Sequence, residues 1–149
     1  MEIFGSKINA LLSRAAARDL HDVANMIHYG IFDESEEDLL RKCVVFYAAV
    51  SARNINKTFD TGALDQLTKH RIRTDLFSVI RNKDALDLDS TKKVVRNYID
   101  DLIKLTESEA EFLDRFENTE YRPELLFQQE EVVARLSQHP MAVWKMQTK

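Results

Sequence analysis

Apolar residues in the first thirty positions recur at intervals of three and four, which is the spacing of one buried face of an α-helix. Two such runs follow one another, and their apolar members are Ile3, Ile8, Leu11, Leu12, Leu20, Val23, Ala24 and Ile27. The 149 residues contain only three Gly and two Pro. Because sheets joined by tight turns need more of both, the chain predicts helices joined by short polar connections.

Apolar residues at intervals of three and four, together with a few capping residues, indicate where the other helices begin and end. Gly30 is positioned to end the second helix, Ser35 and Ser90 are positioned as N-caps, and Pro123 suits a first helical turn. We expect helices over residues 3–16, 18–29, 36–52, 62–69, 91–116 and 123–136, with a final turn from residue 140 that carries Trp144. Residues 44–50 are almost wholly apolar, so the third helix should be the most buried. The expected fold is an all-α bundle of six or seven helices, forming a single domain over residues 1–149.

Charge and cysteine content narrow the class of protein. The formal net charge is −4, whereas nucleic-acid-binding domains are usually basic. The single cysteine, Cys43, excludes an internal disulfide and lies in an apolar run that predicts a buried, inert thiol. No segment approaches the roughly 18 apolar residues of a membrane helix, and the N-terminus lacks a signal-peptide pattern. We therefore expect a cytoplasmic protein without a membrane partner.

Five charged residues interrupt the apolar pattern of the first two helices: Lys7, Arg14, Arg18, Asp19 and Asp22. The two aspartates are three positions apart, so on a helix both carboxylates lie toward one face. A lysine and a carboxylate pair on adjoining helices suit phosphate and metal chemistry. They equally suit a structural cluster, in which one of the arginines pairs with the two aspartates. From the residues alone, both interpretations stay open.

Other charged patterns have simpler explanations. Asp87 and Asp89 alternate as in the metal-binding strands of polymerase-like folds, but they stand in a charged loop and predict a helix start. The densest basic run, residues 69–73, suits a solvated helix end better than a phosphate-binding surface. No two histidines are spaced as in a zinc site; they are His21, His28, His70 and His139.

The first 23 residues contain the pattern E-x-x-x-x-K-x-x-A-L-x-x-R followed by R-D-x-x-D. Its members here are Glu2, Lys7, Ala10, Leu11, Arg14, Arg18, Asp19 and Asp22. This segment resembles the AbiEii/AbiGii abortive-infection toxin family of nucleotidyltransferases. The resemblance is specific over about thirty residues. Beyond them it is looser, resting on a helical second half that ends in a segment containing His139, Pro140 and Trp144.

The resemblance implies a bacterial toxin that is paired with an AbiEi-like antitoxin. Members of the family hold two Mg²⁺ ions against a nucleoside triphosphate with a Gly-Ser…Asp-x-Asp strand. By this resemblance Lys7, Asp19 and Asp22 are the catalytic residues, with Lys7 contacting the triphosphate and the aspartates supporting it. Lys7, Arg14 and Arg18 are the expected substrate-binding residues. Such a set suits phosphoryl transfer, which depends mainly on positioning and on charge stabilisation.

The sequence departs from the family pattern at one essential place. Gly5 and Ser6 run directly into Lys7, and no Asp-x-Asp strand follows them. We therefore expect residues 1–149 to be the helical C-terminal portion of such an enzyme, inactive and without metal by itself. Its partners would be the N-terminal nucleotidyltransferase domain and the antitoxin.

Two further hypotheses come from other classes of protein. The first is a truncated, non-catalytic interaction module that binds an antitoxin or a separate catalytic half. It predicts an exposed apolar patch and self-association into a homo-oligomer. The second is a helical RNA-binding domain that uses Lys69, Arg71, Arg73 and Arg81, and the acidic balance of the chain disfavours it.

Overall fold

The computed structural model describes residues 1–51, 55, 57–76 and 87–148, and every regular element in these ranges is a helix. This confirms the all-α fold class. None of these helices is long and apolar enough to span a membrane. The α-helices are α1 (Glu2–Arg14), α2 (Ala17–His28), α3 (Glu34–Ser51), α4 (Lys69–Leu76), α5 (Leu88–Leu102), α6 (Glu107–Glu117), α7 (Glu130–Ser137) and α8 (Pro140–Thr148), and the 3₁₀ helices are η1 (Thr61–Gln66) and η2 (Pro123–Leu125).

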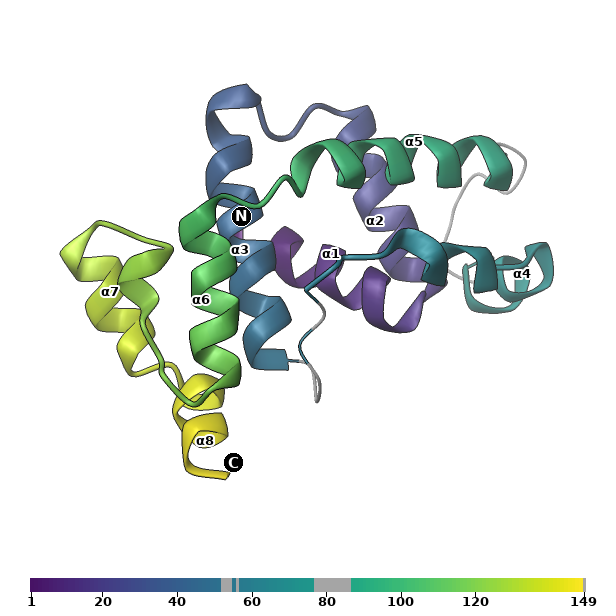
Figure 1. The fold of residues 1–149 in the computed structure, drawn as a ribbon. Helices are drawn as coiled ribbons and strands as arrows, with labels where there is room; N and C mark the ends of the chain where they lie inside the picture. The colour runs from purple at the N-terminus through teal and green to yellow at the C-terminus, as the bar shows by residue number, and fades with distance from the viewer. Residues whose placement is uncertain (52–54, 56, 77–86, 149) are drawn as a thin grey trace.

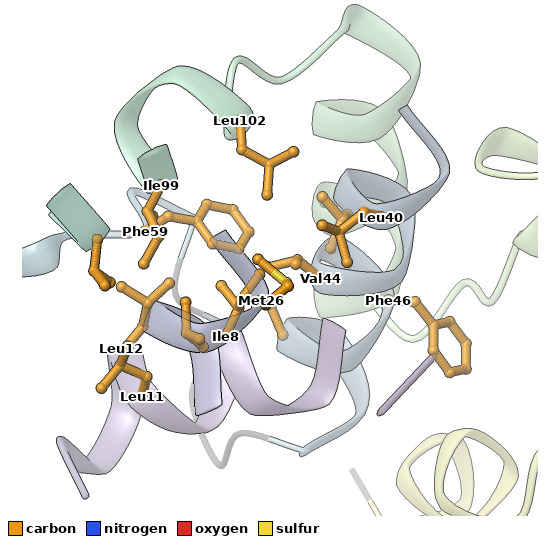
Figure 2. Close-up of a cluster of buried hydrophobic side chains, with 14 of the residues drawn as sticks. Ile8, Leu11, Leu12, Met26, Leu40, Val44, Phe46, Phe59, Ile99 and Leu102 are labelled. Carbon is orange, nitrogen blue, oxygen red and sulfur yellow. The ribbon is translucent and has the colours of Figure 1, made fainter. Parts of the chain in front are cut away.

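Helix α3 lies at the centre of the packing. It contacts α1, α5, α6 and α8, while α2 joins α1 to α4 and α5 (Figure 1). Residues 43–50 are buried except for the half-buried Tyr47, as the apolar run predicts. Figure 2 shows Met26 and Val44 facing one another in the core, with Phe46 on the other side of α3. Phe46 there packs edge-on against His139, at 5.1 Å between ring centroids.

The end of α2 follows the sequence prediction, whereas the start of α3 does not. Gly30 has a φ of 54°, and the N–H of Ile31 donates to Met26 O at 3.1 Å, which is a glycine-terminated helix end. Helix α3, however, begins at Glu34 and is capped by Asp33. Asp33 Oδ1 accepts hydrogen bonds from the N–H groups of Ser35 and Glu36, at 2.8 and 3.2 Å. The expected Ser35 N-cap is therefore wrong, because the carboxylate two residues earlier reaches the same N–H groups.

The expected long helix over residues 91–116 is two helices. Helix α5 begins at Leu88, capped by Asp87 and not by Ser90, and ends at Leu102. Thr106 then starts α6 with a capping box: the Thr106 side chain accepts from the Glu109 N–H, and the Glu109 side chain accepts from the Thr106 N–H. Apolar spacing continues across this break, so spacing alone does not reveal it.

Two shorter segments also differ from expectation. The helix predicted over residues 62–69 is η1, whose start is capped by Asp60, and Lys69 instead begins α4. The helix predicted over residues 123–136 consists of η2, which Pro123 opens, and the separate α7. Residues 77–86, which lie between the helices expected over residues 62–69 and 91–116, are outside the described residues.

The thiol of Cys43 is buried in α3, as the sequence predicts. Burial, with a smaller contribution from Glu2, raises the pKa of the Cys43 thiol to about 11. We expect iodoacetamide at pH 8 to modify Cys43 at least roughly 100-fold more slowly in the folded protein than in urea, because the thiolate is the reactive form. Mass spectrometry of timed samples measures this ratio, and equal rates would contradict the buried placement.

Candidate functional site

The turn between α1 and α2 gathers the charged residues of the N-terminal segment. Helix α1 ends at Arg14 and is followed by the C-cap residue Ala15, whose φ of 47° is left-handed and whose N–H donates to Leu11 O at 3.0 Å. Helix α2 starts two residues later. Each helix buries apolar side chains, including Leu11 and Leu20, in the same core. The polar faces of the two helices consequently meet on one side of the helical pair.

Two ion pairs join these polar faces. The Lys7 ammonium donates to Asp22 Oδ2. The Nε and Nη2 atoms of Arg14 both donate to Asp19 Oδ2, at 3.0 and 2.9 Å. The structure therefore pairs the predicted lysine with the second aspartate of the R-D-x-x-D pattern, and an arginine with the first. The structural cluster expected from the sequence is therefore present in part, because Arg14 pairs with Asp19 alone and Asp22 pairs with Lys7. The phosphate-binding interpretation stays a prediction.

Burial separates the roles of the two pairs. The side chain of Asp19 is 6% exposed, so its carboxylate depends on Arg14 for compensation of its buried charge. The side chains of Lys7 and Asp22 are 33% and 37% exposed, and such a pair contributes only about 0–1 kcal/mol to stability. The Arg14–Asp19 pair thus has a structural function. The Lys7–Asp22 pair adds little to the fold and remains accessible to a ligand.

These residues line an open cleft of about 880 Å³ between the α1–α2 pair and α4. His21 also lines it, and one ring nitrogen of His21 lies 3.0 Å from Asn25 Nδ2. Arg18 reaches the cleft as an exposed side chain, and we find no ion-pair partner for it among the described residues. All five predicted site residues are therefore brought together: Lys7, Arg14, Arg18, Asp19 and Asp22.

The far wall of the cleft was not predicted from the sequence. It is formed by Thr74, Asp75 and Leu76 at the end of α4. Leu76 is buried and anchors the helix, while the other two side chains are exposed. No local pattern in residues 69–76 indicates that they face α1 and α2, because that placement depends on how α4 packs against α2.

The carboxylates of the cleft are engaged with cationic side chains. Asp22 forms an ion pair with Lys7, and Asp19 forms an ion pair with Arg14. Within the ranges that the structure describes, no three His, Cys, Asp or Glu side chains are grouped so as to bind a metal. The lining carries three cationic side chains, Lys7, Arg14 and Arg18, and three carboxylates, Asp19, Asp22 and Asp75. Two of the cations are held by carboxylates, and cationic donors of this kind can bind an anion.

The remaining sequence candidates lie elsewhere. Asp87 caps α5, as expected of a helix start, and its side chain accepts from the N–H groups of Asp89 and Ser90. The basic run forms the first part of α4, where Lys69, Arg71 and Arg73 are exposed. Arg81 lies outside the described residues.

Comparison of this chain with models of protein families, with curated proteins and with solved structures finds no match. The functional argument therefore depends on the geometry of the residues. That geometry consists of a half-exposed lysine fixed by a carboxylate, with two arginines beside it, in an open cleft.

Proposed function

We propose that this chain is the helical portion of an AbiEii-like nucleotidyltransferase toxin and that it supplies the phosphate-binding part of the active site. In this proposal Lys7 binds the triphosphate of a nucleotide, with Arg14 and Arg18 beside it. Asp22 orients the lysine, and Asp19 orients Arg14. The metal-binding strand, with its Mg²⁺, belongs to a catalytic half outside residues 1–149, and an AbiEi-like protein is the antitoxin.

The Lys7–Asp22 pair is the observation that carries the proposal. It is accessible from the cleft and contributes little to stability, so a purely structural explanation of it is weak. An ammonium held in place before its ligand arrives loses less side-chain freedom when it binds. Phosphoryl transfer requires such preset charges around the triphosphate. The resemblance of the segment to the nucleotidyltransferase family supports the same assignment.

Replacement of Lys7 by alanine tests the proposal. We expect inorganic tripolyphosphate to shift the backbone amide signals of α1 and α2 in the NMR spectrum of the labelled protein. Lys7→Ala should weaken this binding at least about 10-fold, since it removes a charged hydrogen bond, and should change the free energy of unfolding by no more than about 1 kcal/mol.

The matched control is Lys42→Ala, because Lys42 forms a comparable half-exposed ion pair with Asp38 at 2.7 Å, away from the cleft. This variant should bind tripolyphosphate as the wild type does. Unchanged binding by Lys7→Ala, or no binding by the wild type, would contradict the proposal and leave the interaction-module hypothesis. We also expect no magnesium-dependent nucleotide transfer to RNA from residues 1–149 alone, and robust transfer would show that the chain is not half of a site.

A further inference from the structure

A second hollow of about 740 Å³ lies at the other end of α1, between α3 and the C-terminal segment. This volume is within the range of small-molecule sites in proteins. Its walls are mainly apolar and aromatic. They include Leu39, Phe46 and Tyr47 from α3 and Phe127, Val132 and Leu136 from the segment that contains α7. We call this hollow the apolar pocket.

A third hollow shares lining residues with both the apolar pocket and the charged cleft. It is shallower, with a volume of about 420 Å³, follows the open face of α1 and lies between the two. It shares Glu2 and Tyr47 with the apolar pocket, and it shares Lys7, Arg14 and Asp19 with the cleft. Residues 2 and 7 are about 7.5 Å apart along a helix axis, at about 1.5 Å per residue. Lys7 and Tyr47 both line this third hollow, so one ligand can contact both side chains.

Several polar groups lie in the apolar pocket. They include the N-terminal Met1 and the buried Nδ1 of His139, for which we find no hydrogen-bond partner among the described residues. Glu2 and Arg135 satisfy one another across its rim, at 2.6 Å. Burial raises the pKa of Tyr47, and that of the Cys43 thiol is raised as well, so both groups are neutral at pH 7. The ring of Tyr47 stands edge-on to Phe46, with 5.5 Å between centroids. The mainly apolar and aromatic walls of this end suit a flat ring, whereas the Lys7 end suits an anion.

On the basis of the function proposed above, we propose that the apolar pocket beside Tyr47 receives the base of the nucleotide whose phosphates lie at Lys7. A nucleotide has the required division of chemistry, with a flat uncharged ring at one end and anionic oxygens at the other. Stacking of a base on an aromatic side chain is strong enough to increase affinity about 10-fold. Because stacking tolerates any base, the pocket provides affinity for a nucleotide without selecting a sequence.

NMR titration of the wild type with tripolyphosphate and with each of the four ribonucleoside triphosphates tests this proposal. We expect at least one nucleotide to bind about 10-fold more tightly than tripolyphosphate. Tyr47→Ala should remove this advantage and leave tripolyphosphate binding unchanged. Val132→Trp, which fills the pocket from α7, should have the same effect without altering α3. The control is Ala134→Trp, on the exposed face of α7, which should behave as the wild type.

The outcomes separate this inference from the function on which it depends. If nucleotides and tripolyphosphate bind equally well to the wild type, the base has no site, and the inference is wrong while the phosphate-binding function stands. If a nucleotide advantage persists in both Tyr47→Ala and Val132→Trp, the base lies elsewhere and the inference is wrong. If neither ligand binds, the proposed function fails and the inference fails with it.

Discussion

Replacing Glu109 by alanine is expected to lower the free energy of unfolding by about 3–5 kcal/mol, which is the usual effect of removing one partner of a buried ion pair. The Glu109 side chain is fully buried. Both of its oxygens lie 3.0 Å from Arg41 Nε on α3, and Oε2 accepts from the Thr106 N–H at 2.8 Å. The variant leaves the half-buried Arg41 without this carboxylate and the first turn of α6 without half of its capping box.

Urea denaturation followed by circular dichroism measures this loss, with Glu111→Ala as the control. Glu111 lies one half-turn further along α6 and also binds an arginine, Arg115, at 2.6 Å, but both side chains are 40–47% exposed. The control should change stability by less than about 1 kcal/mol. Equal effects of the two variants would show that the Arg41–Glu109 contact does not hold α6 against α3.

Glu109 also shows why part of the fold could not be read from the sequence. The motif Thr106-x-x-Glu109 is a local start signal for a helix. The apolar positions Leu102, Leu105 and Phe112 nevertheless keep nearly helical spacing across it, so periodicity favours one continuous helix. The contact from Arg41, which comes from 68 residues earlier and binds Glu109, supports the break. A contact of that separation has no local sequence signal.

The candidate site likewise has one part that the sequence predicts and another part that depends on distant contacts. Its α1–α2 half was predictable, because helical spacing and a two-residue turn are sufficient to place Lys7 near Asp22. Which cation binds which carboxylate was not predictable, since it depends on how far each side chain is buried. The wall formed by Thr74 and Asp75 depends on the docking of α4, and the apolar pocket depends on side chains contributed by three distant parts of the chain.

Replacing Gly5 by alanine is expected to lower the free energy of unfolding by about 2 kcal/mol. A Cβ at this position would lie 2.6 Å from Cys43 Cβ, 3.0 Å from Cys43 C and 3.1 Å from Val44 N. Two of these atoms belong to the backbone of α3 and cannot rotate away, so overpacking should cost about 3 kcal/mol, at the upper end of its usual range. The better helix propensity of alanine returns about 1 kcal/mol.

Thermal and urea denaturation of Gly5→Ala measure this effect, and Ser6→Ala is the control at the next, half-buried position of α1, with an expected change within about 0.5 kcal/mol. A Gly5→Ala protein as stable as the wild type would mean that α1 and α3 do not approach as closely as the structure shows. The contact also bears on the proposed nucleotide site. Gly5 lies between Glu2 and Lys7 on the helix, so it sets the distance from Lys7 on α1 to Tyr47 on α3. A folded Gly5→Ala protein should therefore keep its affinity for tripolyphosphate, which depends on α1 and α2, and lose part of its advantage for nucleotides.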